Sequence, residues 1–153
     1  MPEVEVDGQR IELRAVRLDE IMDLRHEVLR HGLPRESAVF DGDNAPTSRH
    51  YAAIHDGRAV GCATLHLNQW EGEPAWQLRG MATDPPFRGR GVGRALLQWV
   101  ESDARAAGPV RLLWCNARAP AVPFYQSQGW AIRSDLFDIP TAGPHRRMTK
   151  RLA

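Results

Sequence analysis

The chain has 153 residues, which is enough for one well-packed core and too few for two domains of ordinary size, so we expect a single domain over residues 1–153. Its 42% hydrophobic and 25% charged residues exclude a chain that stays disordered. A net charge of +1 argues against a nucleic-acid partner, and no apolar run reaches the roughly 20 residues that cross a bilayer. Because the acidic start is also unlike a signal peptide, we expect a cytoplasmic protein without a membrane partner.

The first third of the chain predicts a strand, a helix and a long loop. Apolar and polar residues alternate over Arg10–Arg17, the pattern of a strand with one wet face. Apolar residues then recur at helical spacing over 21–29, with Asp19 as the N-cap and Gly32 after the end. The stretch 34–48 lacks periodicity and is rich in Pro, Gly, Asp and Asn, so we expect a loop of the kind that often binds ligands, with at most a short helical turn.

The middle of the chain predicts a hairpin and a further strand. His50–His55 and Ala59–Asn68 are apolar or β-favouring, and Asp56-Gly57 between them is a strong signal for a two-residue turn. Ala75–Thr83 follows as a strand, and the turn at 84–86 ends it. Gly80 lies inside this strand, where glycine often marks a bulge or a close approach of two backbones.

The later part of the chain predicts a βαβ unit and a closing pair of strands. Over 91–107 apolar residues follow spacings of three and four, which predicts a helix, and the short apolar run Val110–Cys115 predicts a strand buried on both faces. A helix over 117–128 and strands over 130–137 and 146–151 complete the chain. These elements predict an α/β or α+β protein with a mixed sheet.

A glycine-rich turn, Arg88-Gly89-Arg90-Gly91-Val92-Gly93, connects the strand that ends at Thr83 to the helix at 91–107. Such a turn aims several backbone N–H groups and the positive end of the helix dipole at one anion. It is not a P-loop, because Arg94 follows the last glycine where that motif has lysine, and it lacks the third glycine of the dinucleotide fingerprint. The alternative is a tight connection without a ligand, but the flanking arginines favour an anion.

The turn matches R/Q-x-x-G-x-G/A, the pyrophosphate motif of the GNAT family of N-acetyltransferases, in the required strand–turn–helix context. Two further features resemble the family: Asn116 after the buried strand, and a Tyr-x-x-x-Gly-aromatic segment from Tyr125 to Trp130. Phe40-Asp41-Gly42-Asp43, leading to His50, and Gly143-Pro144-His145 resemble the ElaA-like subgroup. The main motifs span about residues 75–131, and the order of elements is similar over the whole chain.

The resemblance implies the GNAT fold, with a mixed, mostly antiparallel central sheet, a βαβ cofactor-binding unit and flanking helices. In this family two central strands splay apart, and the pantetheine arm of acetyl-CoA pairs with the free strand edge, here 81–83; Gly80 would help to open the splay. No metal site is expected. The residues implied to bind the cofactor are Met81, Ala82, Thr83, Arg88, Gly89, Arg90, Gly91, Val92, Gly93, Arg94, Asn116 and Tyr125.

The chemistry implied by the resemblance is direct acetyl transfer from acetyl-CoA to a primary amine of a small molecule or peptide. Tyr125 would be the catalytic acid that protonates the leaving thiolate, and a backbone N–H near Met81 would stabilise the oxyanion; a packing role for Tyr125 is the alternative. Asn116 either bonds the cofactor or caps the following helix. Transfer through Cys115 is disfavoured, because its apolar surroundings should raise the pKa of the thiol.

The general base is open, since the strand at 75–83 carries no carboxylate. Arg79 stands where some relatives have an acid; it would hold either a carboxylate of the acceptor or an internal acid. Without an obvious base, a catalytically weak acyl-CoA-binding sensor or adaptor with the same fold is the alternative function, and a homodimer is possible. The candidate bases, beside a chain of waters, are Glu36, Asp41, Asp43, His50 and His66.

Overall fold

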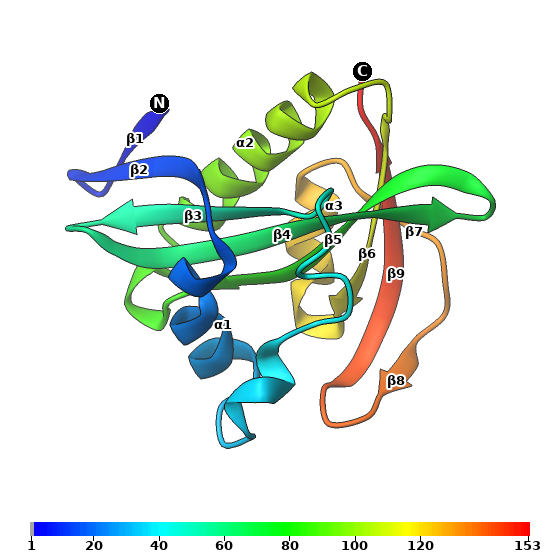
Figure 1. The fold of residues 1–153 in the computed structure, drawn as a ribbon, viewed down its shortest axis with the longest axis horizontal. Helices are drawn as coiled ribbons and strands as arrows, with labels where there is room; N and C mark the ends of the chain where they lie inside the picture. The colour runs from blue at the N-terminus through cyan, green and yellow to red at the C-terminus, as the bar shows by residue number, and fades with distance from the viewer. Residues whose placement is uncertain (1) are drawn as a thin grey trace.

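The computed structural model describes residues 2–153 and shows a strongly twisted mixed sheet with helices on both faces (Figure 1). Short 3-10 turns lie at Leu18–Glu20, Arg35–Ala38, Pro85–Phe87 and Ala119–Ala121. The helices and strands, in chain order, are β1 (Glu3–Val6), β2 (Gln9–Val16), α1 (Met22–Leu29), β3 (Arg49–His55), β4 (Arg58–Trp70), β5 (Glu73–Thr83), α2 (Val92–Ala106), β6 (Leu112–Arg118), α3 (Val122–Ser127), β7 (Ala131–Ile132), β8 (Phe137–Ile139) and β9 (Gly143–Arg151).

The strands form one sheet in the order β1-β2-β3-β4-β5-β6-β9-β7, and β8 also pairs with β9. Every pairing is antiparallel except that of β5 with β6, the two strands that α2 connects. The predicted mixed, mostly antiparallel sheet with a βαβ unit is therefore confirmed.

Two hydrophobic clusters lie on opposite faces of the sheet. Alternate residues of a strand point to opposite faces; accordingly Ala53 packs in the cluster beneath α2, and its neighbour Ala52 packs in the cluster beneath α1. Strands β3 and β4 at the centre are buried on both faces, which explains their nearly continuous apolar sequence. This double burial makes the middle of the sheet a rigid support for the residues at its open end.

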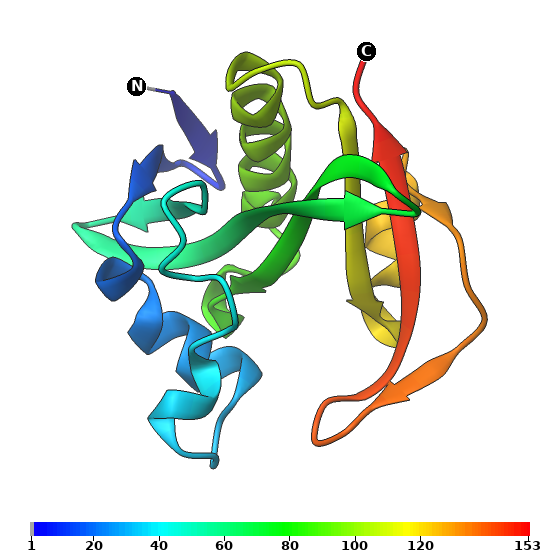
Figure 2. The same cartoon turned by 45° about the vertical axis from the view of Figure 1, so that its right-hand side comes forward.

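Strands β5 and β6 pair over only three residues and then diverge (Figure 2). The parallel pairing ends at Leu78 and Cys115. Beyond it β5 continues beside β4, and β6 continues beside β9. The predicted splay is therefore present, and residues 79–83 of β5 present a backbone edge that β6 does not occupy.

A β-bulge at Gly80 marks the start of the splay. Cys62 pairs with Ala82 and Thr64 with Arg79, so Ala63 of β4 faces two residues of β5 instead of one. Gly80 has a φ of 58°, in the left-handed region, and a Cβ there would lie 2.8 Å from Nε of Arg25. The bulge expected from this glycine is confirmed, and both its conformation and its close contact require glycine.

Two expectations about the elements are wrong, and one strand was missed. Strand β1, which pairs with β2, was not predicted. The helix expected over 117–128 is only Val122–Ser127, because β6 runs on to Arg118 in pairing with β9. The strand expected over 130–137 is interrupted between β7 and β8, where the Ser134 side chain, in place of a strand carbonyl, accepts the hydrogen bond of the Arg147 N–H at 2.8 Å.

None of the helices within residues 2–153 has the length and apolarity needed to cross a membrane. Cys62 and Cys115 are free, buried thiols.

Candidate active site

The glycine turn leads directly into the first turn of α2. Gly91 precedes the helix in the left-handed conformation, with a φ of 94°, and its carbonyl accepts the Ala95 N–H at 3.0 Å. The N–H groups of the first helical turn have no acceptor within the helix. These backbone N–H groups therefore form a cluster of hydrogen-bond donors at the N-terminus of α2, which is also the positive end of its dipole.

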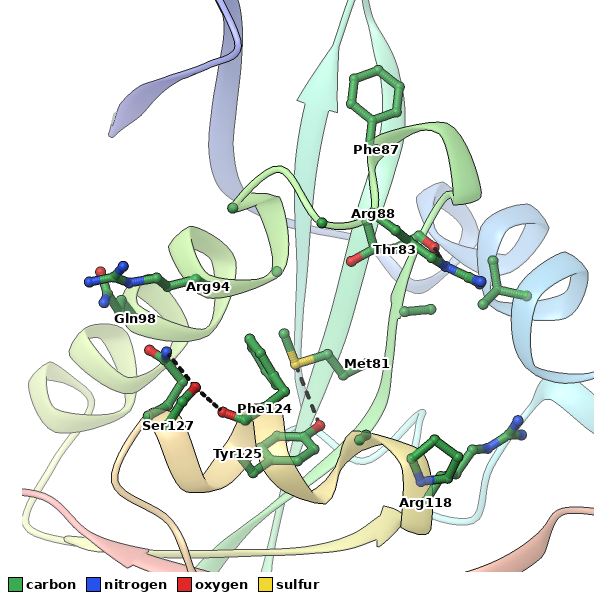
Figure 3. Close-up of a pocket in the computed structure, with 18 of the residues that line it drawn as sticks. Met81, Thr83, Phe87, Arg88, Arg94, Gln98, Arg118, Phe124, Tyr125 and Ser127 are labelled. Carbon is green, nitrogen blue, oxygen red and sulfur yellow. Dashed lines mark hydrogen bonds between the residues drawn. The ribbon is translucent and has the colours of Figure 1, made fainter.

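A cavity of about 1130 Å³ extends from this turn to the splay between β5 and β6 (Figure 3). Pro120, Ala121 and Phe124 supply part of its apolar wall, while Gln98, Ser127 and Lys150 add polar groups that the sequence analysis did not single out. Arg88 also donates from Nε to the Thr83 carbonyl at 3.0 Å, which ties the turn to the end of β5. The expected cofactor-binding residues that line the cavity are Met81, Ala82, Thr83, Arg88, Gly89, Gly91, Gly93, Arg94 and Tyr125.

The other three expected cofactor-binding residues have different surroundings. The Val92 side chain is fully buried in the core, which leaves only its backbone at the turn. Arg90 forms an ion pair with Asp7, at 3.4 Å between Nη1 and Oδ2. Asn116 lies within β6, six residues before α3 begins, so it does not cap that helix, and it is one of the residues that line a second cavity.

Tyr125 is held at the splay by its neighbours in the Tyr-x-x-x-Gly-Trp segment. Its ring centroid lies 5.5 Å from that of Trp130, whose indole N–H donates to Glu101 at 3.0 Å. The Tyr125 hydroxyl donates to Sδ of Met81 at 3.6 Å, as Figure 3 shows. Burial raises the pKa of Tyr125, so the phenol stays protonated, and a thioether is a weak acceptor that leaves this proton available.

A second cavity, of about 520 Å³, meets the first at the splay. Leu29, Met81, Arg118, Ala121 and Tyr125 line both cavities. Cys115 also lines the second cavity, but burial raises the pKa of its thiol to about 12, so it is a poor nucleophile at neutral pH. The tyrosine hydroxyl therefore lies where two chambers of different composition adjoin.

Two of the candidate bases belong to a buried structural network. Asp43 is paired with Arg25 at 2.7 Å, and both side chains are almost completely buried. Arg25 also donates to the Ala38 carbonyl at 2.9 Å and to Thr64 at 2.7 Å. Nε2 of His50 lies 3.0 Å from the Asp43 carbonyl, so it carries a proton, and Nδ1 accepts from Thr64 at 2.8 Å. This network fastens the 34–48 loop to β3 and β4.

The remaining candidate bases differ in their access to the cavities. Glu36 is exposed in the 34–48 loop, and Nδ1 of His66 lies 3.2 Å from the Ser48 hydroxyl; neither Glu36 nor His66 lines either of these two cavities. Asp41 lines the second cavity, and its backbone carbonyl accepts a hydrogen bond from Arg79. Among the described residues, Arg79 thus has no acidic side chain as its hydrogen-bond partner.

His145 is a candidate that the sequence analysis quoted only for its subgroup resemblance. It is buried in β9 and lines the second cavity. Its Nδ1 lies 2.7 Å from the Gly143 carbonyl, which can only accept, so in the neutral imidazole Nδ1 carries the proton and Nε2 has the lone pair. Nothing in the sequence near His145 predicts this position, because the pairing of β9 with β6 brings it beside the splay.

Comparison with known proteins agrees with this geometry. The acetyltransferase (GNAT) family model matches residues 16–130. The chain is 30% identical over 148 residues to the uncharacterized N-acetyltransferase YitI of Bacillus subtilis, covering 93% of this chain and 97% of that protein. It is 31% identical over 124 residues to an aminoalkylphosphonate N-acetyltransferase of Salmonella typhimurium, covering 73% of this chain and 77% of that protein.

The fold is also shared with solved structures. The crystal structure of Escherichia coli ElaA has a TM-score of 0.78 at 18% identity and covers 92% of this chain and 99% of its own. The family match extends over the glycine turn, the splayed strands and Tyr125. From the match and the YitI similarity together, we conclude that this chain belongs to the GNAT family of acetyltransferases.

Proposed function

We propose that the chain transfers an acetyl group from acetyl-CoA directly to a primary amine of a small molecule or peptide. The observation that carries this proposal is the meeting of the two cavities at Met81 and Tyr125, between the splayed strands. One chamber ends at the glycine turn, and the other is lined by polar and charged side chains. The names of the two curated relatives, both N-acetyltransferases, support transfer to nitrogen.

The first cavity fits coenzyme A by its backbone chemistry. The N–H groups at Gly91, Val92 and Gly93 would hold the diphosphate, with Arg88 and Arg94 as flanking positive charges. The free edge at 81–83 would pair with the amides of the pantetheine arm, as an added strand does. Bound there, acetyl-CoA supplies an activated thioester. Asn116, on the facing strand, would donate a side-chain N–H to the same arm near its reactive end, which leaves its Oδ1 for the acceptor.

Each proton in the transfer has a candidate carrier. Attack of the amine nitrogen on the acetyl carbonyl breaks the carbon–sulfur bond, and Tyr125 would donate its proton to the departing sulfur. A backbone N–H near Met81 would hold the oxyanion. His145 would receive the proton lost from the amine at Nε2, directly or through water, and Asp41 is the other proton acceptor in the second cavity.

The test is a comparison of binding with turnover. Calorimetry should show that acetyl-CoA binds far more tightly than inorganic pyrophosphate, because the adenosine and pantetheine parts add contacts along the first cavity. A thiol-release assay with acetyl-CoA and a broad amine panel should then detect transfer. Tight binding without release of thiol for any amine would support the sensor function instead, and equal affinity for the two ligands would overturn the proposed cofactor site.

A further inference from the structure

Three arginines line the second cavity, from positions far apart in the chain. Arg30 follows α1, Arg79 lies in β5 at the bulge, and Arg118 ends β6. All three side chains are partly buried. Arg30 and Arg79 line this cavity alone, whereas Arg118 also lines the first.

The hydrogen bonds of these arginines go to neutral backbone groups. Arg30 and Arg118 both donate to the Leu29 carbonyl, at 3.0 and 3.1 Å, and Arg79 donates to the Asp41 carbonyl. Within residues 2–153, no Asp or Glu oxygen lies within 4.0 Å of their guanidinium nitrogens. Arg25, only five residues before Arg30, has such a partner in Asp43.

The charge in this cavity is therefore incompletely balanced. Burial lowers the pKa of Arg30, and electrostatic repulsion from the nearby Arg118 and Arg25 lowers it further. Burial also lowers the pKa of Arg79, although Asp43 and Asp41 act in the opposite direction. Among the described lining residues, Asp41 alone carries a carboxylate against the three guanidinium groups. Partly buried cations without counter-ions are costly unless a ligand supplies the anion.

A second observation shows what else the cavity would recognise. Oδ1 of Asn116 is buried without a hydrogen-bond partner and belongs to a residue that lines the same cavity. His145 adds an Nε2 lone pair. Both atoms can accept an N–H group, so the residues that line the cavity combine cationic donors with neutral acceptors. A ligand that carries both an anionic group and an amine matches both kinds of group.

We propose that the acceptor is a small primary amine that bears an acidic group, a carboxylate or a phosphonate, and that Arg30 and Arg79 bind this acid in the second cavity. This inference rests on the proposed acetyl transfer and names its substrate class. Arg118, at the border with the first cavity, would contact the acceptor or the cofactor. A volume of about 520 Å³ suits a small molecule of this kind.

The first experiment compares acidic amines with neutral amines of the same carbon chain. Glycine, β-alanine and γ-aminobutyrate are each assayed against the corresponding amide, and aminoethylphosphonate against ethanolamine. We expect kcat/KM for the preferred acid to exceed that for its neutral counterpart by roughly 10-fold or more, because charge-assisted hydrogen bonds to arginine are lost in the neutral compound. Comparison of kcat/KM between the carboxylates and the phosphonate shows which acidic group the cavity prefers. Equal kcat/KM within every pair would overturn the proposal while leaving acetyl transfer intact.

The second experiment replaces the arginines. Arg30→Gln and Arg79→Gln should each lower kcat/KM for the acid by about 10- to 100-fold and leave that for the neutral amine nearly unchanged. Arg105→Gln, which removes an exposed charge on α2 away from both cavities, should leave both values as they are. A merely structural effect would lower both substrates together. An unchanged ratio of acid to neutral amine in both cavity variants would exclude these arginines as the acid-binding groups.

Binding of the acid can be measured without turnover. Calorimetry with β-alanine and aminoethylphosphonate, in the presence of free coenzyme A and in its absence, should show binding to the wild type that Arg79→Gln weakens by about 10-fold or more. If coenzyme A fails to bind, the proposed cofactor site is wrong, and the titration without it still decides on the acid site. Absence of binding of every acidic probe in both titrations would overturn the acid site.

Discussion

The two cavities that meet at Tyr125 are built in different ways. The binding groups that we propose for the first are mostly backbone atoms of one continuous stretch, 81–94, which contains the glycine turn and the free strand edge. The second is lined by residues of four strands, β5, β6, β8 and β9, and of the end of α1, among them Arg30, Arg79 and His145. The comparison teaches that the proposed binding of the cofactor depends mainly on backbone groups. The proposed selection of the acceptor amine depends on side chains.

Removing Arg25 should be the most damaging change and should act on the acceptor side. Arg25→Met leaves the buried Asp43 carboxylate without its partner, which we expect to lower the free energy of unfolding by about 3–5 kcal/mol. Urea denaturation measures the loss. The 34–48 loop should loosen first, because Arg25 also holds the Ala38 carbonyl, and protease cleavage confined to that loop would report it.

The matched control is Arg35→Met in the same loop. Arg35 pairs with Asp23 at 2.6 Å, but both side chains are largely exposed, so the change should alter stability by less than about 1 kcal/mol. Equal losses for the two variants would show that the buried network does not support the loop.

Replacing Tyr125 tests the junction of the cavities. Tyr125→Phe keeps the ring between Phe124 and Trp130 but removes the proposed proton donor, so we expect kcat to fall by about 100-fold. The affinity for coenzyme A, measured by calorimetry, should change little. The chain has one other tyrosine, Tyr51, whose hydroxyl donates to Asp103 away from both cavities. Unaltered kcat in Tyr125→Phe would remove the assigned acid, and Tyr51→Phe should affect stability alone.

The cofactor side was predictable because its signals are local. Gly91, the turn before it and the helix after it are adjacent in the sequence, and the helix predicted over 91–107 is confirmed as Val92–Ala106. The Asp56-Gly57 turn likewise predicted the pairing of β3 with β4. Where local patterns gave a wrong prediction, pairing with a distant strand determined the structure. Strand β9 holds β6 in strand conformation to Arg118, and this pairing shortens the expected helix.

Changing the glycine turn should affect the first cavity only. Gly91→Ala forces a side chain into the left-handed conformation, which costs about 1–2 kcal/mol, although its Cβ would meet no atom within 4 Å. If binding requires this conformation, affinity for coenzyme A should fall by about 10-fold. Gly57→Ala has the same conformational cost in an equally open turn and should leave affinity unchanged. Equal coenzyme A affinity in both variants would contradict the role of the turn.

The acceptor-side network should also respond to pH, with a smaller effect. Burial lowers the pKa of His50 below its ordinary value of 6.5, so on acidification the unfolded chain takes up a proton before the folded chain does. Its contribution to stability is therefore complete at pH values above the ordinary pKa of 6.5 and is lost progressively as the pH falls through the lowered pKa of the folded chain. Protonation would also place a donor on Nδ1, which now accepts from Thr64.

Denaturation at several pH values checks this expectation. His50→Asn should lower stability at neutral pH and flatten its dependence on pH below about 7. His31→Asn, which changes a largely exposed imidazole, should retain the slope of the wild type. A slope that persists in His50→Asn would assign the effect to another group.

The acceptor side was harder to predict from the sequence. Arg79 was singled out, but neither Arg30 nor Arg118 has a sequence pattern that marks it, since helix ends and strand ends commonly carry arginine. Only the pairing of β9 with β6 and the packing of the 34–48 loop bring these residues to one cavity. Asp43 and His50 were candidate bases because a sequence does not reveal that Asp43 is paired with Arg25 and that His50 is hydrogen-bonded to Thr64.

The separation of β5 from β6 has a consequence for how the protein avoids aggregation. Unpaired strand edges usually lie at the rim of a sheet, where they recruit strands of other chains. Here an unpaired edge lies in the interior of the sheet, with β6 on one side and α3 across its opening. To pair with this edge, a strand of another protein, with its side chains, would have to displace β6 and α3. A single narrow chain that carries amide groups could pair with it without displacing them. The same gap can thus admit a slender ligand and exclude a second protein.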